Sequence, residues 1–217
     1  MTKLVVFDCD GTLVDSQVAI VRSMDIAFGA AGLPPPDRNA VRRIVGLSLP
    51  QALRALAPDA SVDQHAHALE AYKASFRAAR SEGTLEQPLY PGIRTLLERL
   101  QAAGKTLGVA TGMSDRGLDA CLARHGVRAL FATLQTADRH PSKPHPAMLE
   151  AALLEAGVAP GDAVMVGDTV FDIAMAQAAG VRAIGVAWGY HDPEELRDAG
   201  AIGIARSADE LEELIGD

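Results

Sequence analysis

The chain has 217 residues, of which 48% are hydrophobic and 22% are charged, and its formal net charge at pH 7 is −8. This length allows a sizeable buried core, in one domain or in one domain with an insertion. The acidic balance and the lack of a Lys/Arg block argue against nucleic acid or a membrane surface as a partner, because a phosphate backbone requires a basic stripe.

The sequence also argues against export and membrane insertion. No apolar run approaches the roughly 18 residues of a transmembrane helix, and the first residues do not resemble a signal peptide. The two cysteines, Cys9 and Cys121, lack the spacing of a disulfide framework. We therefore expect a cytoplasmic protein.

The first predicted element is a buried strand over "LVVF" (residues 4–7), and it is followed at once by acids. Asp8, Asp10 and Asp15 stand within eight positions, although bunched carboxylates repel one another and are costly to desolvate. Either the stretch is a solvated loop, or the molecule supplies a positive partner for these charges.

Between Ser16 and Gln87 the pattern is helical, and no run resembles a strand. Apolar residues of 17–31 share one helical face. Two further helices are predicted from capping boxes, formed by Ser48 with Gln51 and by Ser61 with Gln64. A helical unit inserted after the first strand is the simplest explanation, so we expect a core domain of residues 1–15 and 86–217 and a helical domain of residues 16–85.

From Pro91 onward, helices alternate with short apolar strands, which predicts an α/β fold with right-handed βαβ units and a parallel sheet. The expected strands are residues 105–111, 129–135, 163–167, 182–187 and 201–205. The expected helices run from Pro91 to Gly104, from Ser114 to Gly126, across Met148 to Gly157, around Ile173 to Gly180, from Asp192, and from Ser207 with Glu210 as its capping partner.

Polar residues follow several of these strands, and ligands of parallel α/β sheets bind at the carboxyl ends of the strands. Carboxylates gathered there favour a hard cation such as Mg²⁺, whereas a lysine and the N–H groups of a glycine-bearing turn can hold an anion. Together they indicate a phosphoryl-transfer site. The residues concerned are Asp8, Asp10, Gly11, Thr12, Thr111, Gly112, Lys143, Asp168 and Asp172.

Four stretches, "DCDGT", "VATG", "SKP" and "VGDTVFD", resemble in sequence and order the four motifs of the haloacid dehalogenase-like superfamily. Within it the chain is similar to the phosphoglycolate phosphatase and β-phosphoglucomutase branch. The resemblance covers the whole chain and implies a parallel-sheet, Rossmann-like core with an inserted small α-helical cap.

The resemblance also implies roles for individual residues. Asp8 matches the nucleophile that forms an aspartyl-phosphate, and Asp10 matches the general acid/base. Lys143 matches the lysine that holds Asp8 and the phosphoryl group. Two further sets are implied: phosphate or substrate binding by Gly11, Thr111, Gly112, Lys143 and Arg43, and Mg²⁺ binding by Asp8, Asp10 (through its backbone carbonyl), Asp168 and Asp172, the last directly or in the outer shell.

Several residues have a simpler explanation beside the functional one. Asp15 is expected to cap the helix that begins near Ser16, and Cys9 is expected in the core. His140 and His145 flank the lysine, but the surrounding prolines predict an extended loop rather than a zinc site. Arg43 either meets a second charged group of the substrate or lies on a solvated helix face.

We therefore expect a Mg²⁺-dependent phosphatase that hydrolyses a small phosphorylated metabolite, phosphoglycolate-like or a sugar phosphate, as a monomer or homodimer. A β-phosphoglucomutase-like phosphomutase is the alternative, and the motifs do not separate the two. A receiver-type signalling domain, which also groups acids, a threonine and a lysine around magnesium, is a remote third hypothesis, because it lacks a helical insertion after the first strand.

Overall fold

The computed structural model describes residues 2–216 of the chain, and these contain a six-stranded parallel sheet. The spatial order is β3-β2-β1-β4-β5-β6, so β1 lies in the middle and the order reverses beside it. The strands are β1 (Leu4–Phe7), β2 (Thr106–Thr111), β3 (Thr133–Thr136), β4 (Ala163–Gly167), β5 (Arg182–Val186) and β6 (Gly203–Ala205).

The strand register places three strand ends side by side. Phe7 is opposite Val109 of β2 and Val166 of β4, and all four residues of β1 are fully buried. A strand covered on both faces reads as a continuous apolar run, which is why "LVVF" is uninterrupted. The residues that follow β1, β2 and β4 therefore meet at one edge of the sheet.

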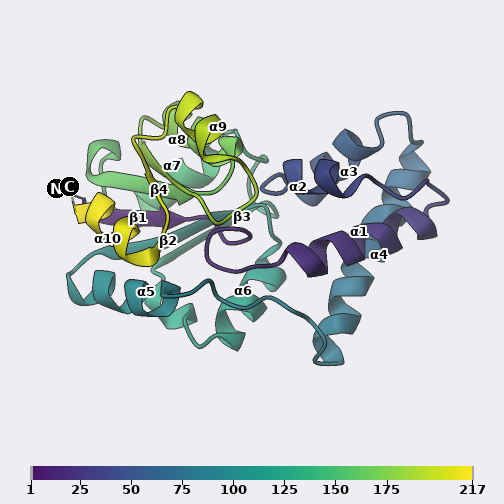
Figure 1. Cartoon of the computed structure of the whole chain (residues 1–217), viewed down its shortest axis with the longest axis horizontal. Coiled ribbons are helices and arrows are strands. Elements are labelled where there is room, and N and C mark those ends of the chain that lie inside the picture. Colours follow the sequence, from purple (N-terminus) through teal and green to yellow (C-terminus); the bar gives the residue numbers. More distant parts are fainter. Residues whose placement is uncertain (1, 217) are drawn as a thin grey trace.

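Helices cover both faces of the sheet (Figure 1). The first face packs against α5 (Ile93–Ala102), α6 (Asp115–Arg124) and α10 (Ala208–Gly216), and the second against α7 (Ala147–Ala156), α8 (Val170–Ala178) and α9 (Pro193–Asp198). Each face has its own apolar cluster, because successive side chains of a strand point to opposite sides. Two 3₁₀ turns, Arg128–Leu130 and Pro160–Asp162, complete the connections.

The residues between β1 and α5 form four helices that lie to one side of the sheet (Figure 1). They pack into a third apolar cluster, to which the sheet region adds Tyr190. This separate cluster agrees with an insertion, and the exact division at residues 16 and 85 stays a prediction. The helices are α1 (Gln17–Ala30), α2 (Arg38–Arg43), α3 (Leu49–Leu56) and α4 (Val62–Ser81).

The two segments that join this helical insertion to the sheet run side by side. The Asp15 N–H donates to the Pro88 carbonyl at 2.8 Å, and the Tyr90 N–H donates to the Leu13 carbonyl at 3.0 Å. Val14 forms an antiparallel bridge with Leu89. The insertion therefore connects to the core through one paired, two-chain neck.

Two local predictions needed correction, and one short helix was missed. The hydroxyl of Ser48 does not cap α3; instead the Ser48 N–H donates to the Ser142 hydroxyl at 2.8 Å, because the segment before α3 rests on the core. Residues 129–135 are a strand only from Thr133, since the first part forms a 3₁₀ turn. The short helix α2 was not predicted separately. The Ser61–Gln64 capping box is confirmed.

No helix within residues 2–216 combines the length and the apolar character needed to cross a membrane.

Candidate active site

The site begins where β1 ends. Asp8 follows Phe7 directly, its side chain is 1% exposed, and its N–H donates to the Val166 carbonyl at 2.9 Å. Asp10 is partly buried and accepts a hydrogen bond from the Ser16 hydroxyl at 2.5 Å. The sequence places two acids at alternate positions, and the fold gives them different surroundings.

Gly11 is required by this turn. Its φ is +88°, and a Cβ there would lie 2.2 Å from Oδ2 of Asp168 and 2.5 Å from the Tyr190 ring. A side chain at this position would therefore be strained in the backbone and would collide with the neighbouring acid. This glycine therefore lets the turn after β1 pack against Asp168; its predicted role in phosphate binding stays a prediction.

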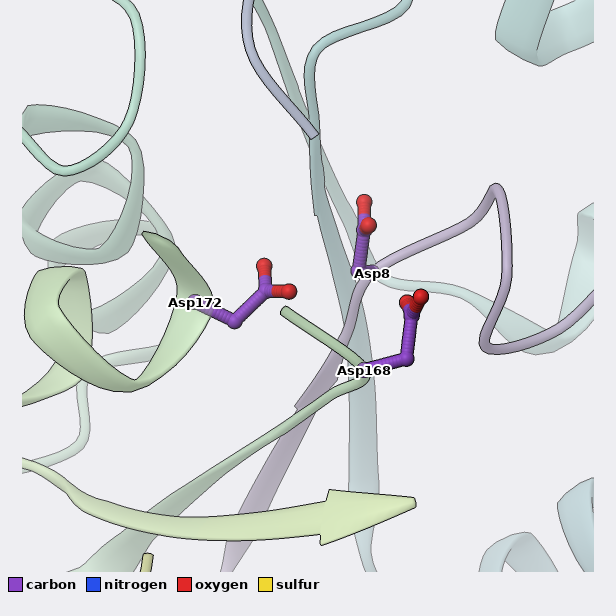
Figure 2. A group of neighbouring side chains, drawn as sticks. All are labelled: Asp8, Asp168 and Asp172. Carbon is purple, nitrogen blue, oxygen red and sulfur yellow. The ribbon is translucent and has the colours of Figure 1, made fainter. Parts of the chain in front are cut away.

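Three acids come together beside this turn (Figure 2). Asp8 follows β1, Asp168 follows β4 and Asp172 lies in the first turn of α8. A carboxylate oxygen from each lies within 4.8 Å of the others, and all three residues are buried. The predicted convergence of these residues is therefore present in the structure, although they are far apart in sequence.

Lys143 is the cation of this cluster. Its ammonium lies 2.9 Å from Oδ1 of Asp8 and 2.6 Å from Oδ1 of Asp172, and its side chain has no exposed surface. Three buried carboxylates share one buried ammonium, so with all groups ionised the cluster has a deficit of two positive charges. A buried charge without a partner is costly, and the deficit matches the charge of one divalent cation.

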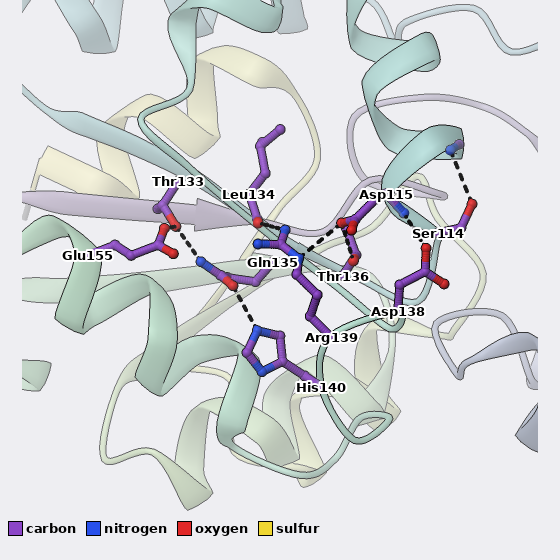
Figure 3. Close-up of polar contacts among 11 residues, drawn as sticks. Ser114, Asp115, Thr133, Leu134, Gln135, Thr136, Asp138, Arg139, His140 and Glu155 are labelled. Carbon is purple, nitrogen blue, oxygen red and sulfur yellow. Dashed lines mark hydrogen bonds and ion pairs between the residues drawn. The ribbon is translucent and has the colours of Figure 1, made fainter.

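The loop that carries Lys143 is fixed by side-chain contacts with β3 and with the start of α6 (Figure 3). His140 lies 2.8 Å from Oε1 of Gln135, Gln135 donates to the Thr133 hydroxyl at 2.7 Å, and Arg139 pairs with Asp115 at 3.1 Å. His140 therefore helps to hold the loop. The predicted absence of a zinc site at His140 and His145 stays a prediction.

The other two acids are held by hydrogen bonds that leave little freedom. Asp168 accepts from the Thr12 hydroxyl at 2.8 Å and from the Tyr190 N–H at 2.9 Å. Asp172 accepts from the N–H and the hydroxyl of Thr169 at 3.1 and 2.7 Å, as the third helical residue in a capping box whose N-cap is Thr169. Such contacts orient a carboxylate toward a ligand before the ligand arrives.

Burial dominates the ionisation of these acids. It raises the pKa of Asp8 to about 7, against the lowering effect of the Lys143 charge. Burial also raises the pKa of Asp168 well above its usual range. The pKa of Asp10 is raised by burial and partly restored by the Ser16 hydrogen bond and the Lys143 charge.

The donor set fits a magnesium ion. Within residues 2–216, neither oxygen of Asp8 accepts a well-formed hydrogen bond, although Lys143 is in ion-pair contact with Oδ1. Buried oxygens are normally satisfied, so Asp8 retains capacity for a ligand. Hard cations take oxygen ligands, and Mg²⁺ is commonly bound by one or two carboxylates together with a phosphate.

A cavity of about 440 Å³ opens in front of Asp8 and Asp10. Its floor includes Thr111 and Gly112, and its opposite wall comes from the helical insertion. A Cβ at Gly112 would lie 2.5 Å from the Leu47 carbonyl oxygen, so this glycine permits the insertion to approach the sheet. The predicted residues Asp8, Asp10, Thr111 and Gly112 therefore share one cavity, with Lys143, Asp168 and Asp172 behind it.

Arg43 is placed differently. It does not line this cavity within the described chain; its guanidinium pairs with Glu195 of α9 at 2.6 Å, on an exposed surface. The Arg43 carbonyl lies 3.2 Å from Nε2 of His191. Asp15 is exposed and accepts from the Gln17 N–H at 3.2 Å. It stands one position before the N-cap of α1, which is Ser16, and Cys9 lies in the core as expected.

The sequence analysis did not identify several residues that line the cavity, among them Tyr72, Phe76, Arg80 and Gln87. In the sequence, Tyr72 and Phe76 are indistinguishable from the other apolar positions of a helix. Gln87 was treated as linker, because a single glutamine in a loop carries no pattern.

Comparison with known proteins agrees with the motifs. The family model of the haloacid dehalogenase-like hydrolases matches residues 5–186. Among curated proteins, the chain is 38% identical to the probable phosphatase IndB of Dickeya dadantii, over 92% of this chain and 87% of that protein. It is 32% identical to the tyrosine-protein kinase PtkA of Mycobacterium tuberculosis (99% and 72%) and 30% identical to the phosphoglycolate phosphatase of Vibrio parahaemolyticus (98% and 96%).

Among solved structures, a predicted phosphatase from Clostridium acetobutylicum superimposes with a TM-score of 0.89 at 28% identity, covering 99% of this chain and 98% of that one. The family model covers most of the chain, and the fold agrees over nearly its full length. The chain therefore belongs to the haloacid dehalogenase-like hydrolase family and is one of its enzymes.

Proposed function

We propose that this enzyme is a Mg²⁺-dependent phosphatase that hydrolyses a small phosphorylated metabolite through an aspartyl-phosphate on Asp8. The observation that carries the proposal is the charge deficit behind Asp8: three buried carboxylates within 4.8 Å share the single ammonium of Lys143. At this point the three carboxylates can bind a divalent cation, and the Lys143 ammonium can bind the oxygens of a phosphate dianion.

In the first step, the Asp8 carboxylate attacks phosphorus and the bond between phosphorus and the ester oxygen breaks. Asp10 gives its proton to the departing alkoxide, and the raised pKa of Asp10 favours the protonated form that this role requires. Lys143 holds Asp8 in position through its ion pair at 2.9 Å. Bound Mg²⁺, held by Asp8, Asp168, Asp172 and the backbone carbonyl of Asp10, would neutralise charge on the phosphoryl oxygens.

In the second step, a water molecule attacks the aspartyl-phosphate. Asp10, now a carboxylate, takes a proton from that water, and the bond between phosphorus and Asp8 breaks to release inorganic phosphate. The same residue thus acts as acid and then as base. The Ser16 hydroxyl, which donates to Asp10 at 2.5 Å, keeps its carboxylate at one place in the cavity during both steps.

The helical insertion acts as a cap in this proposal. Phosphoryl transfer to Asp8 benefits when water is excluded, and the second step needs water to be admitted, so the cap opens and closes. The paired neck of residues 13–15 and 88–90 supports a hinge, because it is a short connection outside the helices. The contacts that Arg43 and Ser48 make with the core hold the closed form.

A substrate panel tests the proposal. Inorganic phosphate release is measured from p-nitrophenyl phosphate, acetyl phosphate and a set of metabolite monoesters, with Mg²⁺ and with EDTA. We expect turnover that depends on Mg²⁺ and stops with EDTA. Turnover that persists unchanged in EDTA would contradict the metal assignment, and an absolute requirement for a sugar bisphosphate would favour the phosphomutase alternative.

A further inference from the structure

The cavity is large for the smallest substrates of such a reaction. Its volume of about 440 Å³ falls in the range of roughly 300–1,000 Å³ that is typical of pockets for drug-sized ligands. The carboxyl carbon of 2-phosphoglycolate lies three bonds from phosphorus, which is about 4 Å at ordinary bond lengths. Such a molecule, with its phosphoryl group at Asp8, would leave most of the cavity unfilled.

The wall opposite Asp8 and Asp10 is built from helix α4 and is aromatic. Tyr72 and Phe76 line the cavity, and their ring centroids are 5.0 Å apart with an interplanar angle of 33°. Asp8 and Asp10 line the same cavity as these two rings. Aromatic rings offset at this distance present a surface on which another flat ring packs favourably.

Gln87 supplies an unused polar group to the same cavity. Its side chain lines the cavity and is only 3% exposed, and within residues 2–216 its Nε2 has no hydrogen-bond partner. The residue is held by its backbone, because the Gln87 carbonyl lies 2.7 Å from Nε2 of His125. A buried amide donor without a partner is costly, and a ligand that brings an acceptor oxygen would remove that cost.

The same helix carries a cation farther along the cavity. Arg80 also lines it, and no ion pair or side-chain hydrogen bond joins its guanidinium to another described residue. Arg80 is eight residues beyond Tyr72, about 12 Å along a helix. A substrate that occupies the cavity from Asp8 toward this end is longer than a two-carbon acid.

We infer that the substrate is a phosphate monoester whose alcohol part contains a flat ring with a hydrogen-bond acceptor, with the ring packed on Tyr72 and Phe76 and the acceptor bound by Gln87. This inference rests on the proposed function and narrows it. It makes the cap wall and the neck the specificity-determining surface, and it disfavours 2-phosphoglycolate as the preferred substrate.

Three probes test the substrate class in the wild-type enzyme with Mg²⁺: 2-phosphoglycolate, benzyl phosphate, which has a ring without an acceptor, and pyridoxal 5′-phosphate, which has a ring with acceptor oxygens. We expect kcat/KM for the two ring esters to exceed that for 2-phosphoglycolate by at least about 10-fold, because a buried ring contributes that much. Equal or better use of 2-phosphoglycolate would overturn the inference.

Variants test the residues. Gln87→Leu should raise KM for pyridoxal 5′-phosphate by about 3- to 10-fold, the effect of one hydrogen bond, and leave KM for benzyl phosphate unchanged. Phe76→Leu should raise KM for both ring esters by a similar factor. Gln101→Leu is the matched control, since Gln101 is exposed on α5, outside the cavity.

A binding measurement separates recognition from turnover. Dissociation constants of the ring esters are measured by calorimetry in an Asp8→Asn background, with and without Gln87→Leu. The same ranking as for KM is expected, and equal affinities with and without Gln87→Leu would overturn the role of Gln87. If neither acetyl phosphate nor any phosphomonoester releases phosphate with the wild-type protein, the proposed function itself fails. If the enzyme is active but prefers 2-phosphoglycolate, only the inference fails.

Discussion

The two walls of the cavity differ in how their polar groups are satisfied. On the sheet side, Lys143 and Asp172 are paired at 2.6 Å, and Asp168 accepts two hydrogen bonds. On the cap side, the lining is largely apolar. Beside it, next to the neck, the amide Nε2 of Gln87 has no partner among the described residues. The polar groups of the sheet side are therefore fixed by contacts within the protein, whereas the amide beside the cap wall is left for a ligand.

This difference has an electrostatic cause. The sheet side gathers more negative than positive charge, and burial raises the pKa of Asp8 to about 7, so the acids are costly until a cation joins them. On the cap side few polar groups are desolvated, and burial of a ligand's apolar surface there is favourable. Substitutions on the sheet side should therefore change turnover and metal binding, and substitutions on the cap side should change KM.

The largest effect is expected from Asp8→Asn. The amide is close in shape but cannot form the phosphoryl ester, so phosphate release should fall below detection. Thermal stability should hold or rise slightly, because one charge leaves a crowded anionic site. Phosphate release and the circular dichroism melting curve check both expectations. Full activity in this variant would contradict the assignment of Asp8 as the nucleophile, and with it the catalytic role of the sheet side.

Asp10→Asn should lower turnover by roughly 10²–10⁴, the range for a lost general acid/base. The loss should be smaller with p-nitrophenyl phosphate, whose leaving group needs little protonation. The measurement is kcat for this ester and for an alkyl phosphate in the same preparation. An equal loss on both would indicate that Asp10 only positions the turn after β1.

Metal binding should depend on pH through the sheet-side acids. The pKa of Asp8 is raised to about 7 in the metal-free fold, and a metal binds the deprotonated form, so affinity falls as pH falls below 7. For one displaced proton, the Mg²⁺ dissociation constant should be roughly 10-fold higher at pH 6 than at pH 8. Calorimetric titration at the two values measures it. No change would indicate that Asp8 is already ionised before the metal binds.

The smallest effect is expected from Arg43→Ala. An exposed ion pair contributes roughly 0.2–1 kcal/mol, and the partner of Arg43 is Glu195. Arg43→Ala and Glu195→Ala should therefore shift the melting temperature alike and alter KM for p-nitrophenyl phosphate and for an anionic metabolite equally. A rise in KM confined to the anionic metabolite, and absent in Glu195→Ala, would return Arg43 to the substrate-binding role that the sequence indicates.

The same contrast explains what could be predicted from the sequence. The acids Asp8, Asp168 and Asp172 follow or flank strands whose parallel pairing dictates where their ends meet, so the pattern alone brought them together. The direction of Arg43 and the exposure of Gln87 depend on how the helical insertion rests on the sheet. That packing is set by contacts between distant segments, such as Ser48 with Ser142. The helical periodicity of the sequence does not predict such contacts.

The backbone at Gly112 sets how closely the two halves of the molecule can meet. A single methyl group there would sit 2.5 Å from the Leu47 carbonyl oxygen and 2.8 Å from that of Gly46, closer than nonbonded atoms tolerate. An alanine at this position would act as a wedge that holds the cap away from the sheet without altering any acid. The activity of such a variant, whose cap cannot close fully, would show how much of the rate enhancement comes from excluding water and how much from the catalytic residues themselves.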